Sequence, residues 1–77
     1  MKVQVYAVLK DYFEKEFTLQ QSFVLIENLK SFLIQQNPKA ENILNISRFA
    51  VNNEIVENDY ILNEHDNISI LPPSSGG

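Results

Sequence analysis

The stretch from Val24 to Asn37 (VLIENLKSFLIQQN) decides the fold, because it is the long segment in which apolar residues repeat with helical spacing. An i, i+4, i+7, i+8 pattern predicts one apolar face of an α-helix, formed by Leu25, Leu29, Phe32 and Leu33. Pro38 marks its end, since the residue before a proline disfavours the helical conformation. Its start is poorly marked, with Ser22 as the nearest capping residue.

Alternating apolar and polar residues on both sides of this segment predict β-strands. The expected strands cover residues 2–9, 17–23, 48–51, 54–56 and 68–71, with a turn at Asn52-Asn53 between the third and the fourth. Residues 11–16 are expected to form a turn or short helix, and residues 39–46 a short helical turn. A sheet with one main helix on one face predicts an α+β fold, the β-grasp arrangement of ubiquitin-like domains.

Composition excludes several classes of function. The 77 residues fit one small domain, expected over residues 1–71, and the net charge of −4 argues against nucleic acid or anionic membranes as partners. The same net charge weakly favours a partner with a basic docking face. The absence of cysteine excludes disulfides, thiolate metal sites and sulfur carried on a thiol of this chain. Without a signal-like start or a membrane-length apolar run, the sequence predicts a soluble, cytoplasmic protein.

The polar residues show no pattern typical of catalysis. His65 stands between Glu64 and Asp66, and adjacent residues do not converge on a metal, so we expect a solvated loop and no metal site. No pair of carboxylates has a spacing that assigns acid and base roles. Three apolar residues are instead expected to point away from the core and to form a docking surface: Tyr6, Ile55 and Leu71.

The chain closes on a six-residue tail, PPSSGG, expected to be flexible over residues 72–77. Glycine has no Cβ, so Gly76 and Gly77 could pass through a channel too narrow for other residues and leave the terminal carboxylate open to attack. Six extended residues reach roughly 20 Å, far enough to enter a pocket on another subunit. The tail therefore indicates that the terminal carboxyl group is the chemically reactive group of this protein.

The chain resembles the family of small subunits of molybdopterin synthase, which are β-grasp sulfur carriers of similar length. The resemblance rests on the closing pattern from Leu62 through His65-Asp66 and Leu71-Pro72-Pro73 to Gly76-Gly77, and on the segments Ala50-Val51-Asn52-x-Glu54 and Val3-x-Val5-Tyr6-Ala7. The proline pair before Gly-Gly is its specific part, because a bare Gly-Gly end also occurs in ubiquitin and in the thiamine-pathway sulfur carrier.

The resemblance implies a defined chemistry. A partner adenylating enzyme would use ATP to convert the Gly77 carboxylate into an acyl-adenylate, and a sulfur donor would then convert it into a thiocarboxylate. The tail would enter the large catalytic subunit and give its sulfur to precursor Z (cyclic pyranopterin monophosphate), forming the dithiolene of molybdopterin. The chain would bind no cofactor and would not be catalytic alone, and the assembly would be a heterotetramer.

The resemblance also implies roles for particular residues. Gly76 and Gly77 carry the chemistry, and the partner-binding residues are Tyr6, Lys10, Ile55, Leu71, Pro72, Pro73, Ser74 and Ser75. Tyr6 and Leu71 stand where the family often has phenylalanine. His65 stands where it usually has glycine, which predicts modest strain if that position requires a positive φ. The open alternatives are a sulfur carrier for thiamine or a tungsten cofactor, a ubiquitin-like modifier and a purely structural domain.

Overall fold

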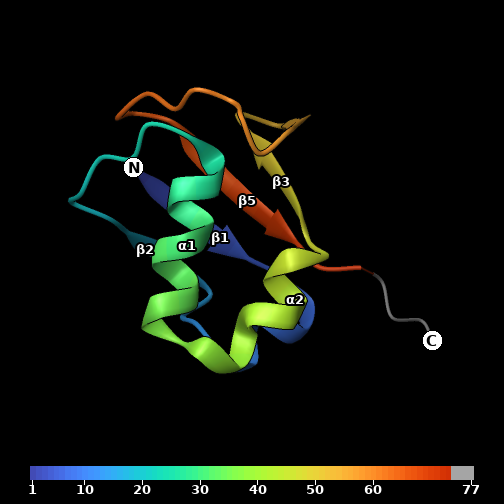
Figure 1. Ribbon diagram of the computed structural model, residues 1–77. Coiled ribbons are helices and arrows are strands. Elements are labelled where there is room, and N and C mark those ends of the chain that lie inside the picture. The colour runs from blue at the N-terminus through green and yellow to red at the C-terminus, as the bar shows by residue number, and fades with distance from the viewer. Residues whose placement is uncertain (74–77) are drawn as a thin grey trace.

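The structure is a computed structural model that describes residues 1–73 (Figure 1). Its five strands form one sheet in the order β2-β1-β5-β3-β4. The strands are β1 (Lys2–Val5), β2 (Glu16–Thr18), β3 (Arg48–Val51), β4 (Glu54–Val56) and β5 (Asn67–Leu71). β1 runs parallel to β5 and the other neighbouring pairs are antiparallel, so the sheet is mixed. The predicted α+β fold is confirmed.

The main helix, α1 (Ile26–Gln36), lies across one face of the sheet (Figure 1). Ile26, Leu29 and Leu33 on its inner side are fully buried and join the core that the sheet provides. The helix begins later than predicted, and Leu25 is its half-buried N-cap. The backbone N–H of Leu25 donates to Oδ1 of Asn28 at 3.0 Å, and this bond, not one from Ser22, caps the helix.

Three short helices complete the fold: η1 (Ala7–Asp11), η2 (Pro38–Ala40) and α2 (Glu41–Asn45). The last two confirm the predicted helical turn after Pro38. Leu44 on α2 is fully buried, so this segment contributes to the core. No helix among residues 1–73 is both long and apolar enough to cross a membrane.

The first strand is shorter than predicted, because β1 ends at Val5 instead of reaching residue 9. Ala7 has a φ of 52°, in the left-handed region, and turns the chain into η1. Ala7 was expected to point inward but is exposed, whereas Leu9 is buried from η1. The apolar alternation continues past Val5 although the strand does not, because the left-handed conformation of Ala7, which its residue type does not predict, ends the strand.

Two turns join the remaining strands. Asn52 and Asn53 have φ values of 50° and 73° and form the two-residue connection between β3 and β4, as predicted. His65 is absent from the positive-φ residues of the described chain, so the condition under which strain was expected at this position is not met. The turn that contains His65 is closed by Asp66. The Asp66 carboxylate accepts hydrogen bonds from the Asn63 N–H at 2.8 Å and from the Asn52 side-chain amide at 3.1 Å.

Candidate functional site

The face of the sheet opposite α1 forms the candidate site, here called the open face. Pairing across the sheet puts Gln4, Ser69, Ala50 and Ile55 in one row. The next row toward the end of β5 contains Leu71 and its partner Arg48, and Tyr6 follows β1 at the same end. Because alternate residues of a strand share a face, these side chains all lie on the open face.

Apolar residues gather where β5 ends. Tyr6 is 41% exposed and Ile55 is 51% exposed, while Leu71 is half-buried between them on the central strand. The predicted outward direction of these three side chains is therefore confirmed. Ala50, which pairs with Ile55, is only 6% exposed, so the accessible apolar surface comes from its neighbours. The result is an accessible apolar area, of the kind that marks docking surfaces.

A chain of polar contacts holds the Tyr6 end of the open face. The Tyr6 hydroxyl donates to Oε1 of Gln4 at 3.2 Å, and Nε2 of Gln4 donates to Oε1 of Glu16 at 2.9 Å. Lys2 Nζ lies 3.1 Å from Oε2 of the same carboxylate. The hydrogen bond from Gln4, followed by that from Lys2, lowers the pKa of Glu16 below its ordinary value. The chain of contacts restrains the Tyr6 ring in a way that a phenylalanine would not allow.

The tail leaves from the middle of the sheet, because β5 lies between β1 and β3. Pro72 lacks an N–H and so cannot continue the ladder, as predicted; it is half-buried, and Pro73 is exposed. The other tail residues to which the sequence assigned roles, Ser74, Ser75, Gly76 and Gly77, lie outside the described residues.

Lys10 is exposed on η1, which starts at the same end of the sheet because β1 and β5 are parallel. It lines a shallow hollow with its chain neighbours Tyr12 and Phe13. The structure thus places Tyr6, Ile55 and Leu71 on the same open face, with β3 between the strands of Leu71 and Ile55, and places Lys10 on η1, outside the strands of that face.

The described polar residues form no cluster suited to metal binding. Among residues 1–73 no group of three or more His, Asp or Glu side chains is placed to hold a metal ion. His65 is exposed, with its Nε2 atom 3.4 Å from Oε1 of Glu64. Sequence reasoning missed the contacts that restrain Tyr6 and the position of Arg48 on the open face, because both depend on which residues pair across strands.

These features define a class of protein: a small β-grasp, ubiquitin-like domain with a free sheet face and a C-terminal extension leaving its central strand. The model of the ThiS family matches residues 3–77, nearly the whole chain. The chain therefore belongs to this family of ubiquitin-like sulfur carriers, which are not catalytic by themselves.

Two solved structures have the same fold. One is a chain in the protein–protein complex of subunits 1 and 2 of molybdopterin-converting factor from Helicobacter pylori 26695, with 23% identity and a TM-score of 0.71, covering 99% of this chain and 96% of that one. The other is SAMP1 from Haloferax volcanii, with 15% identity and a TM-score of 0.81, covering 99% and 97%. At these identities the similarity establishes the fold.

Proposed function

We propose that this chain is the sulfur-carrier subunit of molybdopterin synthase, with sulfur held as a thiocarboxylate on Gly77. The observation that carries the proposal is the family match, which runs to Gly77 itself in a chain without cysteine. A sulfur carrier that has no thiol must hold its sulfur on another group, and the terminal carboxylate is the group that two glycines leave accessible.

The chemistry requires activation of that carboxylate, because its negative charge repels nucleophiles. Attack by the Gly77 carboxylate on the α-phosphate of ATP forms an acyl-adenylate and releases pyrophosphate. Hydrosulfide supplied by a sulfur donor then attacks the acyl carbon and displaces AMP, which leaves the thiocarboxylate. Adenylation and sulfur insertion both need a partner adenylating enzyme, since the described residues hold no nucleotide-binding glycine loop.

The large catalytic subunit is the second proposed partner. The open face would dock through Tyr6, Ile55 and Leu71 with Lys10 beside it, while Pro72 to Ser75 pass along a channel toward the bound precursor Z. Each transfer would give one sulfur to the precursor, water would hydrolyse the acyl group back to the Gly77 carboxylate, and two such transfers would supply the dithiolene of molybdopterin. The solved complex of two molybdopterin-converting-factor subunits supports this choice of partner, and a heterotetramer is the assembly that we propose.

Intact-mass measurement tests the proposal directly. The protein is incubated with ATP, a sulfur source and the adenylating enzyme of the pathway, and its mass is then compared with that of a sample lacking ATP. We expect an increase equal to the replacement of one oxygen by sulfur, localised by fragmentation to Gly77. The control is that the same adenylating enzyme acts on another carrier protein. An unchanged mass of this protein in the presence of that active enzyme would refute the proposal.

Two alternatives share the same family. A carrier for thiamine or a tungsten cofactor would acquire the same sulfur, and pull-down with candidate large subunits separates these pathways. A ubiquitin-like modifier would use the Gly-Gly end to form amide bonds with lysine side chains, and higher-mass conjugates in cell extracts would identify it. The Pro72-Pro73 pair before the last four residues favours the molybdopterin pathway over thiamine.

A further inference from the structure

The charge of the open face differs from that of the chain. The protein has a net charge of −4, yet the strand residues of this face include only three charged side chains, Lys2, Glu16 and Arg48. Lys2 and Glu16 form an ion pair at 3.1 Å and cancel each other. Among the strand residues of this face, the charge that remains is therefore positive and belongs to Arg48, while Glu57, one residue beyond β4, lines a hollow with it.

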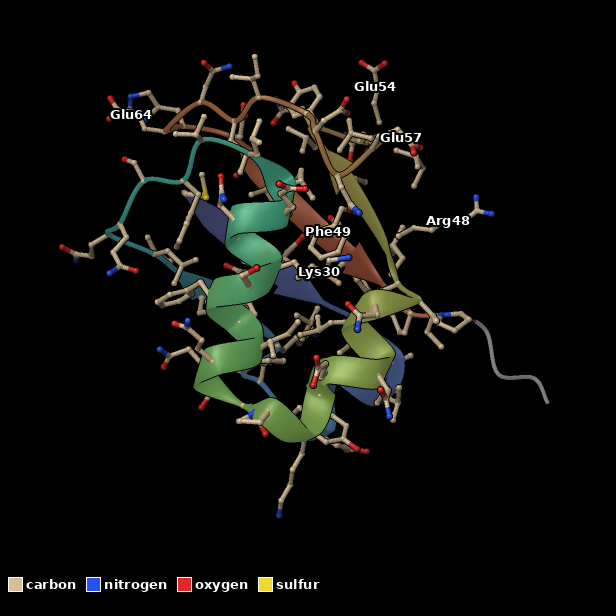
Figure 2. The ribbon with its side chains drawn as sticks, in the orientation of Figure 1. Lys30, Arg48, Phe49, Glu54, Glu57 and Glu64 are labelled. Atoms are coloured by element: carbon tan, nitrogen blue, oxygen red, sulfur yellow. The ribbon has the colours of Figure 1, made fainter. Side chains whose placement is uncertain are left out.

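Arg48 lies next to the point where the tail leaves, because its Cα partner across the sheet is Leu71. Figure 2 shows its side chain projecting away from the helices, with Glu57 the nearest labelled carboxylate in this view and Glu54 and Glu64 farther from it. It lines a hollow of about 410 Å³ together with Ile55, Lys30 and Glu57. Glu57 forms no ion pair with it, and the ion pairs within residues 1–73 leave the guanidinium free.

We propose that Arg48 binds a carboxylate of the large subunit at the rim of the channel that receives the tail. This inference rests on the proposed function and adds the chemistry of the partner surface. Docking would remove water from the apolar residues around Arg48, and a guanidinium that loses water without gaining a partner is costly. A surface complementary to this face must therefore present an acidic group opposite Arg48, despite the negative charge of the whole chain.

The proposed ion pair gives Arg48 a positioning role. An arginine and a carboxylate form two parallel hydrogen bonds, so the contact fixes an orientation as well as a distance. Because Arg48 is paired with Leu71 in the sheet, fixing its position also fixes where the tail starts. Arg48 does not touch the reacting atoms, and its substitution should affect binding more than the rate of transfer at saturation.

Binding of the Arg48→Glu variant to the purified large subunit tests the inference. We expect Kd to rise by roughly 10- to 100-fold, mostly through slower association at low salt, and we expect Arg48→Lys to lose less than the charge reversal. Lys39→Glu is the matched control, because it makes the same charge change on an exposed residue of η2. Thermal unfolding should show that all three variants fold.

Two results would overturn the inference: equal weakening in Arg48→Glu and Lys39→Glu, or a defect of Arg48→Glu seen with the adenylating enzyme but absent with the large subunit. Failure of the proposed function looks different. In that case the wild-type protein itself neither gains sulfur nor binds the large subunit. The expected result is a raised KM for sulfur transfer in Arg48→Glu, with kcat restored at saturating concentration.

Discussion

Truncation of Ile55 measures how much the apolar part of the open face contributes to docking. The residue is 51% exposed in the free protein, so about half of its surface is available for burial by a partner. Fully burying an isoleucine side chain contributes about 1.5–3 kcal/mol, and half of that is about 0.8–1.5 kcal/mol. Ile55→Ala should therefore raise Kd for the large subunit about 4- to 12-fold, as measured by calorimetric titration.

Ile61→Ala provides the matched control for this experiment. Ile61 is 68% exposed, but it pairs with Leu25 in an isolated bridge at the start of α1 and lies outside the strands of the open face. Both truncations remove the same atoms, so only a difference in Kd reports on docking. Equal Kd values for Ile55→Ala and wild type, or equal losses in the two variants, would refute the assignment of the open face.

The remaining predictions concern the tail and the stability of the fold. Deleting Gly77, or adding one residue after it, should abolish sulfur acceptance with unchanged thermal unfolding; retained molybdopterin synthesis would contradict the mechanism. Asp66→Ala should lower the free energy of unfolding by about 2–4 kcal/mol in urea titration, because the Asn63 N–H and the Asn52 amide lose their acceptor, and an unchanged midpoint would show that water replaces it. Ala7→Gly should raise the free energy of unfolding by about 0.5–1 kcal/mol, because alanine is strained at a φ of 52°. A lower free energy of unfolding would show that the strain is relieved locally.

The sequence predicted those parts of the fold that depend on local pattern. The helical spacing of Leu29 and Leu33 identified α1, and the asparagine pair identified the turn between β3 and β4. The end of β1 was mispredicted because Val5, Ala7 and Leu9 continue the strand alternation, although the chain turns into η1 after Val5. The left-handed conformation at Ala7 makes this turn, and alanine gives no sign of it.

The sequence predicted the apolar residues of the candidate site but not the interactions of its charged residues. Alternation along β1 and β5 is enough to place Tyr6 and Leu71 outward, because each lies opposite a buried neighbour. The interactions of Glu16 and Arg48 depend on pairing between strands that are distant in sequence. The burial of Asp66 was not predicted either. It follows from contacts with Asn63 and with Asn52, which lies on another turn 14 residues away.

The register of β5, fixed at one end of the sheet, determines which side chains lie on the open face at the other end. Side chains alternate along a strand, so a shift of β5 by one residue would bury Leu71 and bring Ile70 outward. Asn52 opposes such a shift, because its backbone N–H donates to the Asn67 carbonyl at 2.9 Å and its side chain accepts from the Asn67 N–H at 3.1 Å. The Asn52 side chain in turn donates to the buried carboxylate of Asp66. This polar network lies at the opposite end of β5 from Pro72, yet it helps to determine that Leu71 lies on the open face and that the chain leaves the sheet beside Arg48.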